Sequence, residues 1–245
     1  MTRPGRVEVL GVGVDPVDRA GLLDAVGRLV DARGRATVGY VNVHVLGVAH
    51  GDAGLRRFLD AADLVYCDGG GVVLGARLLG KDLPERMTGA DWIWDLAARA
   101  EAAGWRIFWM GGEPGVAEEA ARRLRERHPR LAVAAEHGFH RDAGPVVAAM
   151  NAFGPDIVLV GMGTPLQERW VTTHRAAIQA PVVWVTGATA DFVSGHVSRG
   201  PRWLHDRQEW LARLIVDPKR LWRRYLVGNT VFLARVLAAR AGRHG

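Results

Sequence analysis

The amino-acid sequence predicts an α/β fold: a Rossmann-like parallel sheet with helices on both faces, followed by a helical, basic C-terminal appendage. Short runs rich in valine and isoleucine alternate with segments of helical pattern, as in βαβ units. The runs are continuously apolar, which is typical of strands that are buried on both faces. They stop near residue 195. We therefore expect an α/β domain over residues 1–195 and the appendage over residues 196–245.

Seven apolar runs are the expected strands of the sheet. They begin, in chain order, at Val7, Thr37, Asp63, Arg106, Leu131, Asp156 and Val182. The clearest helical segments between them cover residues 18–32, 89–104 and 113–129. After residue 195 the pattern indicates two or more helices, because Pro201 and Pro218 stand where helices start or break.

The length fits either one large α/β domain or one domain plus an appendage. With 245 residues, 49% of them hydrophobic, the chain can bury a sizeable core. The single cysteine, Cys67, cannot form an internal disulfide, so we expect a reducing, cytoplasmic compartment. The first residues lack the apolar core of a signal peptide, and no apolar run reaches the roughly 18 residues that would span a bilayer.

The positive charge is concentrated in the appendage. Residues 199–245 carry eleven Lys/Arg and three Asp/Glu, a net charge of +8, whereas the whole chain carries +6. Such asymmetry favours an anionic partner: nucleic acid, anionic lipid or a phosphorylated substrate. The alternative is a solvated, arginine-rich helical surface.

Candidate site residues follow the strands, because ligands of open α/β sheets bind at the carboxyl ends of the strands. Asp68 ends one run and precedes three glycines, Gly69–Gly71. This is either a turn with a capping aspartate or a carboxylate beside space that the glycines leave for a ligand. Other strands end in glycine-rich turns that lead into helices, at Gly111, Gly112 and Gly163. Backbone N–H groups at such turns favour a ligand that carries phosphate.

Several common motifs are missing. The chain has no complete G-x-G-x-x-G, no P-loop and no Asp-x-Asp. This disfavours a standard NAD site, a P-loop ATPase, and a carboxylate pair that holds a divalent metal on a diphosphate. The nine histidines show no ligand spacing with carboxylates or with the cysteine, so we predict no structural metal.

Ordered blocks along the chain resemble the WecG/TagA/CpsF glycosyltransferases (glycosyltransferase family 26), from about Val7 to Leu237. The resemblance rests on VNVHVL, ADLVYCDGGGVV, RMTGADW, IFWMGGEPGVAEEA, GPDIVLVGMGTPLQERW, TGATADFVSG, SRGPRWL and QEWLARLIVDPKRLWRRYLVGN. It implies a hexosyltransferase that moves a sugar, typically N-acetylmannosamine or its uronate, from a UDP-sugar to a polyprenyl-diphosphate-linked saccharide. It also implies inversion at the anomeric carbon and no cofactor or metal.

The same resemblance implies a setting: the inner face of the plasma membrane, in the synthesis of teichoic acid, common antigen, capsule or another exopolysaccharide. The protein would be a peripheral membrane protein, possible as monomer or homo-oligomer, with no nucleic-acid partner.

The resemblance assigns roles to residues of this chain. Asp68 matches the proposed general base. Residues implied to bind substrate are Tyr40, Asn42, Arg86, Gly111, Gly112, Gly163, Gln167, Glu168, Asp191, Arg213, Arg220 and Arg223. The three appendage arginines would fold over the site and meet the diphosphate.

This chain also departs from the family pattern. Tyr40 stands where the family usually has threonine, and Leu166 where it has lysine. Arg207–Trp210 replaces G-L-E-W, and Arg199–Pro201 replaces R-A-P. These changes indicate an unusual donor or acceptor. Two other classes stay open: a nucleotide-sugar dehydrogenase or epimerase, and a non-catalytic binder of an anionic surface or nucleic acid.

Overall fold

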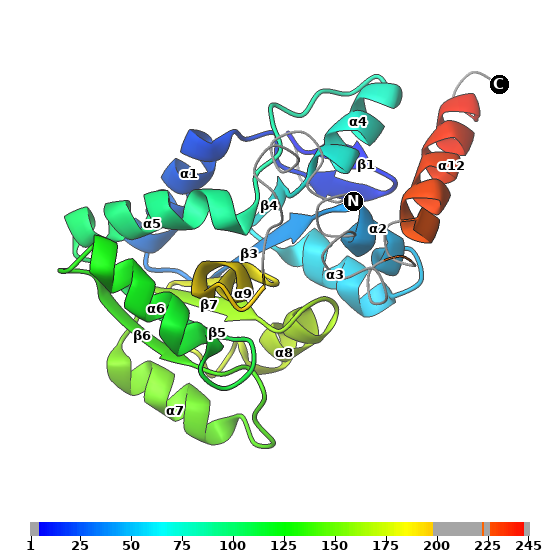
Figure 1. The fold of residues 1–245 in the computed structure, drawn as a ribbon. Coiled ribbons are helices and arrows are strands. Elements are labelled where there is room, and N and C mark those ends of the chain that lie inside the picture. The colour runs from blue at the N-terminus through cyan, green and yellow to red at the C-terminus, as the bar shows by residue number, and fades with distance from the viewer. Residues whose placement is uncertain (1–4, 198–221, 223–225, 243–245) are drawn as a thin grey trace.

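The computed structural model describes residues 5–197, 222 and 226–242. Its centre is a six-stranded sheet with the order β4-β3-β8-β7-β5-β6 (Figure 1). All its strand pairs are parallel, which confirms the predicted sheet. The strands are β3 (Ala36–Val41), β4 (Leu64–Cys67), β5 (Arg106–Gly111), β6 (Ala132–Glu136), β7 (Ile157–Gly161) and β8 (Val182–Val185).

The first apolar run does not join this sheet, and here the prediction is wrong. It folds into β1 (Val7–Val9) and β2 (Val12–Val14), which pair antiparallel as a separate two-stranded sheet. Leu10 and Gly11 connect them with φ angles of 49° and 81°. Two consecutive residues with positive φ form the tight turn that suits the twist of a hairpin.

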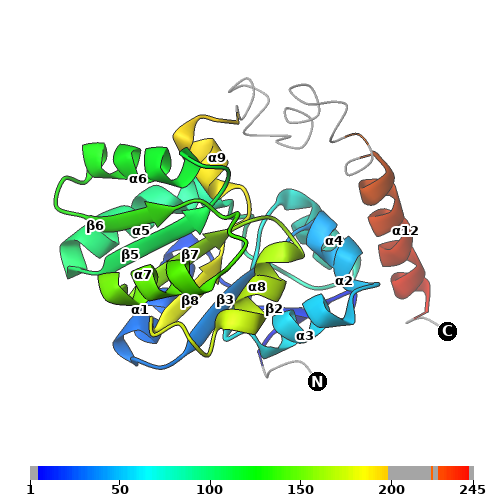
Figure 2. The ribbon, with the colours of Figure 1, turned by 90° about the horizontal axis from the view of Figure 1, so that it is seen from below.

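Helices cover both faces of the six-stranded sheet, as Figures 1 and 2 show. In chain order they are α1 (Arg19–Asp31), α2 (Val43–Ala49), α3 (Ala53–Ala61), α4 (Gly70–Leu78), α5 (Gly89–Ala103), α6 (Val116–Arg127), α7 (Gly144–Phe153), α8 (Leu166–His174), α9 (Thr189–Ser194) and α12 (Gly228–Ala241). Within the described residues, none of the helices is both long enough and apolar enough to cross a membrane.

Aromatic side chains fix the middle of the sheet to α5. The rings of Trp92 on α5 and Trp184 on β8 stack with centroids 3.9 Å apart, and both side chains are fully buried. Tyr66 on β4 meets both rings edge-on, and its hydroxyl accepts a 3.3 Å hydrogen bond from Trp92 Nε1. Buried aromatic pairs of this kind stabilise a fold by more than the burial of their apolar surface alone. They hold the ends of β4 and β8 in fixed positions.

The helix α12 is the described part of the appendage, and it contacts α2 and α4 (Figure 2). Phe232 and Val236 are buried at this contact. A Cβ on Gly75 of α4 would lie 2.5 Å from Phe232 Cζ, so the glycine permits the close approach. The helical prediction is confirmed for this segment. The boundary at residue 195 stays a prediction, and Arg213, Arg220 and Arg223 lie outside the described residues.

Candidate functional site

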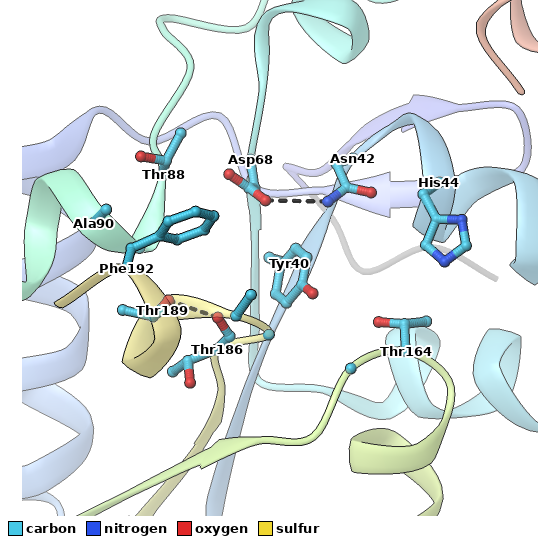
Figure 3. A pocket seen from close by; sticks show the side chains of 14 residues that line it. Tyr40, Asn42, His44, Asp68, Thr88, Ala90, Thr164, Thr186, Thr189 and Phe192 are labelled. Atoms are coloured by element: carbon cyan, nitrogen blue, oxygen red, sulfur yellow. Dashed lines mark hydrogen bonds between the residues drawn. The ribbon is translucent and has the colours of Figure 1, made fainter. Parts of the chain in front are cut away.

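A pocket opens at the carboxyl ends of β3, β4, β7 and β8, and four of the predicted site residues line it: Tyr40, Asn42, Asp68 and Gly163 (Figure 3). It leaves about 670 Å³ of space between protein atoms, a volume that includes open solvent at its mouth. It is lined by Tyr40, Asn42, His44, Asp68, Thr88, Gly89, Ala90, Gly163, Thr164, Thr186, Gly187, Ala188, Thr189 and Phe192. Asp68 is the one carboxylate among these lining residues.

Asp68 and Asn42 form a hydrogen-bonded pair on one wall of the pocket. Asn42 follows β3 and caps α2, and its Oδ1 accepts a hydrogen bond from Val45 N at 2.9 Å. Because the cap engages the amide oxygen, the amide nitrogen faces Asp68 and donates to Oδ2 at 3.1 Å. The backbone N of Asp68 donates to Val41 O at 2.8 Å, which ties the end of β4 to β3. The carboxylate therefore has a defined position at the pocket wall (Figure 3).

The three glycines after Asp68 serve the turn and the packing of α4. Gly69 has a φ of 107°, which side chains rarely tolerate. A Cβ on Gly71 would lie 2.7 Å from Val43 Cγ2, at the start of α2. None of the three glycines lines the pocket among the described residues. The packing of Gly71 lets α4 begin tightly against α2. The interpretation that the glycines clear space beside the carboxylate stays a prediction.

Gln167 and Glu168 lie beneath the opposite wall rather than in it. Gln167 is 0% exposed, its Oε1 accepts from Gly187 N at 3.0 Å, and its Nε2 lies 3.4 Å from the Tyr40 hydroxyl. Glu168 is 2% exposed, and its Oε1 accepts from Thr164 Oγ1 and Gln167 Nε2, both at 2.8 Å. These two buried residues therefore hold Tyr40, Thr164 and Gly187, which line the pocket.

Burial controls the protonation of three groups around the site. It raises the pKa of Glu168 above its usual value, although hydrogen bonds from Gln167 and Thr164 oppose this. It raises the pKa of the Cys67 thiol to about 12, with a further contribution from the charge of Asp68. The pKa of Tyr66 is raised for the same two reasons in the same order. Cys67 therefore stays a thiol at neutral pH, which argues against a nucleophilic role.

Of three further predicted residues, Gly163 lines the pocket, whereas Arg86 and Asp191 are outside the lining but near it along the chain or in the fold. The half-buried Arg86 lies beside the Asp68 turn, since a Cβ on Gly70 would be 3.9 Å from Arg86 Cδ. Gly163 lines the pocket with a φ of 78°. Asp191 is in the first turn of α9, next to the pocket-lining Phe192.

Gly111 and Gly112 lie deeper, at the packed strand ends. Gly112 N donates to Gly161 O at 2.9 Å, and a Cβ on Gly111 would lie 2.5 Å from the same oxygen. These two glycines are absent from the pocket lining among the described residues. Their tight packing shows a role in joining β5 to β7.

The sequence prediction omitted several lining residues from its candidates. His44, Thr88, Thr164, Thr186, Thr189 and Phe192 all belong to the lining. Thr186 follows β8 directly, and His44, Thr164 and Thr189 come within four residues of the end of a strand, so the rule of strand ends points to all of them. Thr88 and Phe192 come from segments that only the fold brings to the pocket.

A second cluster of polar side chains lies outside this pocket, at the end of β6 and in the loop after it. Glu136, His137 and His140 each offer one ligand atom, and these atoms lie within 4.8 Å of one another. The statement that no histidine has ligand spacing with a carboxylate is therefore wrong. The sequence signal was Glu-His-x-x-His over residues 136–140.

Comparison with known proteins gives a consistent family. The family described as "Glycosyl transferase WecG/TagA/CpsF family" matches residues 7–245. A relative from Bacillus spizizenii is 33% identical over 170 residues, which cover 69% of this chain and 66% of the relative. A relative from Staphylococcus aureus (strain NCTC 8325 / PS 47) is 25% identical over 239 residues, which cover 96% of this chain and 93% of the relative.

Both relatives are named N-acetylglucosaminyldiphosphoundecaprenol N-acetyl-beta-D-mannosaminyltransferase. The family match extends from the first strand through α12, and it includes every strand of the pocket. The chain therefore belongs to the WecG/TagA/CpsF family of glycosyltransferases.

Proposed function

We propose that this protein is an inverting, metal-independent glycosyltransferase. It moves an N-acetylhexosamine-type sugar, such as N-acetylmannosamine or its uronate, from a UDP-sugar to a polyprenyl-diphosphate-linked saccharide. The observation that carries the proposal is the Asp68 carboxylate, oriented by Asn42 in the wall of a pocket at the ligand-binding edge of the sheet. The names of the relatives support both the sugar class and the acceptor class.

Asp68 acts as the general base in this proposal. The acceptor hydroxyl attacks the anomeric carbon while the bond to the UDP oxygen breaks on the opposite face, so the configuration inverts. The hydroxyl proton passes to the Asp68 carboxylate as the new bond forms. The hydrogen bond from Asn42 Nδ2 holds that carboxylate in one orientation. Asn42 is thus a positioning residue in this step.

The leaving diphosphate needs positive charge, because negative charge grows on the β-phosphate as the bond breaks. Arg86, which lies against the Gly69–Gly71 turn, is a described residue that can supply it. A guanidinium can donate two parallel hydrogen bonds to a phosphate. The resemblance assigns the same task to Arg213, Arg220 and Arg223.

The acceptor carries a lipid, so the enzyme must work at a membrane surface. Exposed apolar side chains on α12 and just before it fit such a contact: Leu226, Val227, Val231, Leu233 and Leu237 are 40–51% exposed. A helix that presents both apolar residues and arginines can lie in the interface of an anionic membrane. We propose peripheral binding at the inner face of the plasma membrane. Packing of the same residues on a second copy is the alternative.

A donor screen with a lipid-linked acceptor tests this function. The full chain is incubated with UDP-N-acetylmannosamine, its uronate and UDP-N-acetylglucosamine, each with and without a short-chain lipid-diphosphate N-acetylglucosamine. We expect one donor to give a disaccharide product and acceptor-dependent release of UDP, at the same rate in EDTA. No product from any UDP-sugar, with reduction of NAD in the presence of one, would instead indicate a dehydrogenase.

A further inference from the structure

The cluster formed by Glu136, His137 and His140 has the composition of a metal site. It spans the last residue of the edge strand β6, Glu136, and the loop that joins this strand to α7. Its ligand atoms come from two imidazoles and one carboxylate, all within 4.8 Å of one another. The two imidazole rings stack, with centroids 4.1 Å apart and planes 14° apart. All three residues are partly exposed, so a cation can reach them from solvent.

The hydrogen bond of the His140 ring to a backbone carbonyl engages a single ring nitrogen, so the other nitrogen can serve as a ligand. His140 Nε2 lies 2.7 Å from His137 O, and a carbonyl oxygen only accepts, so Nε2 carries the proton. The neutral ring therefore has its lone pair on Nδ1. A histidine ligand that donates its other N–H to a backbone carbonyl is the usual outer arrangement of metal sites.

Glu136 and His137 are also held close to one another. Glu136 Oε1 accepts from the backbone N of His137 at 3.3 Å and lies 3.7 Å from His137 Nε2. His137 Nδ1 accepts a 3.2 Å hydrogen bond from Phe139 N. Ligation through Nε2 moves the ring proton to Nδ1, so this long hydrogen bond is given up. Phe139 is 56% exposed, so a water molecule can then accept the hydrogen bond from its backbone N–H.

The base of the loop is fixed against the neighbouring strands. Gly138 N donates to Gly112 O at 2.9 Å. A Cβ on Gly138 would lie 2.7 Å from Met162 Cγ and 3.2 Å from Gly111 Cα, so the backbone packs directly on the ends of β5 and β7. The backbone between the side chains that would bind a cation is thus held firmly. The side chains themselves are partly exposed, so their rotamers can adjust.

The ligand set selects the class of cation. Two imidazoles with one carboxylate suit zinc and similar transition metals, whereas calcium and magnesium prefer oxygen ligands alone. In a tetrahedral zinc site with metal–ligand bonds of about 2.0–2.2 Å, ligand atoms lie about 3.4 Å apart. The ligand atoms of the cluster, now within 4.8 Å of one another, would therefore have to move slightly closer together to bind zinc. Three protein ligands leave a fourth position for water or an anion.

We propose that Glu136, His137 and His140 bind one zinc-class divalent cation and thereby fasten the β6–α7 loop. The site is separate from the Asp68 pocket, whose lining comes from the ends of β3, β4, β7 and β8 and from α5 and α9. The proposal does not depend on the proposed glycosyl transfer, which uses no metal.

Titration of the full chain, without a histidine tag, tests the site. Zn²⁺ binding is measured by calorimetry, and Co²⁺ by the visible absorption that distinguishes tetrahedral from octahedral coordination. We expect one equivalent of Zn²⁺ to bind to the cluster, a tetrahedral Co²⁺ spectrum, no competition from millimolar Mg²⁺, and a higher Tm with Zn²⁺.

Two variants and one control decide the location. His140→Ala and Glu136→Gln should each weaken Zn²⁺ binding by about tenfold or more. His50→Ala, at an exposed histidine outside the cluster, should leave the binding unchanged. Equal affinity in wild type and both variants, or no binding up to about 100 µM Zn²⁺, would overturn the proposal. Circular dichroism verifies that each variant is folded.

Discussion

The wall of the pocket built by β3 and β4 presents a carboxylate and an amide to the pocket, whereas the wall built by β7 and β8 keeps its carboxylate and amide beneath the lining. On the first wall, Asp68 and Asn42 meet at the surface of the pocket. On the second, Gln167 and Glu168 are buried, and the lining itself has no carboxylate or amide side chain among the described residues. One wall offers a group for proton transfer, while the other offers a fixed shape. Substitutions should therefore affect turnover on the first wall and stability on the second.

The largest effect is expected on the first wall, at Asp68. Asp68→Asn keeps the shape of the side chain but removes its ability to accept a proton as a base. We expect turnover to fall by about 10²–10⁴-fold, as for loss of a general base, with UDP binding retained. Initial rates of UDP release and calorimetric UDP binding measure the two quantities.

The control for this variant is Asp24→Asn, an exposed aspartate that pairs with Arg99 between α1 and α5. It should keep the wild-type rate. Wild-type turnover in Asp68→Asn would contradict the assignment of the base and the division between the two walls.

Gln167→Leu tests the second wall. The substitution leaves Gly187 N without its acceptor inside the protein and removes the hydrogen bond to Glu168. Because an unpaired buried group costs about 1–3 kcal/mol, we expect the free energy of unfolding to fall by about 3 kcal/mol. Denaturant titration measures it, and Gln179→Leu, at an exposed position, is the control. Unchanged stability with lost activity would place Gln167 in contact with substrate instead.

The six strands of the sheet could be predicted from the sequence. Which polar side chains reach the pocket and which are buried beneath it could not. Continuous apolar runs identify buried parallel strands whatever their order, and the rule of strand ends then locates Asn42 and Asp68. The hairpin was missed because its turn, Leu10–Gly11, lies inside one apolar run. The contact between Tyr40 and Gln167 joins residues 127 positions apart, so only the fold reveals it.

Local geometry also lies beyond the sequence pattern in two other places. In the Gly69–Gly71 turn, the backbone angle at Gly69 and the contact between Gly71 and Val43 account for two of the three glycines, and space for a ligand stays a prediction. The cluster with His137 and His140 was overlooked because ligand spacing is usually considered on helices. Here a tight loop folds the two rings onto each other.

Asn42 tests the comparison of the two walls further, because its side chain both orients the Asp68 carboxylate and caps α2. Asn42→Ala removes the cap of α2 and the hydrogen bond to Asp68, whereas Asn42→Ser keeps a capping oxygen. Both variants should lose about tenfold in turnover, since a hydrogen bond to a charged group contributes about 1.5–3 kcal/mol. Only the alanine variant should also lose about 1 kcal/mol of stability. Equal stability losses in the two variants would contradict the capping role.

The smallest expected effect concerns the pH dependence of stability at Glu168. Burial raises the pKa of this carboxyl in the folded protein above the usual 4.5, so the folded state holds its proton at a pH where the unfolded state releases it. The folded state therefore binds more protons, and the contribution of Glu168 to stability is largest below pH 4.5. That contribution decreases as the pH rises from there through the folded pKa.

Glu168→Gln removes the titration while keeping an acceptor oxygen for Thr164 and Gln167. The stability of this variant relative to wild type should thus increase with pH above 4.5. Denaturant titrations at several pH values, with Glu118→Gln at an exposed position as control, measure the difference. A difference that does not change with pH would mean that Glu168 is ionised in the folded protein. The second wall would then hold a charged carboxylate, as the first wall does at Asp68, and the two walls would no longer differ in charge.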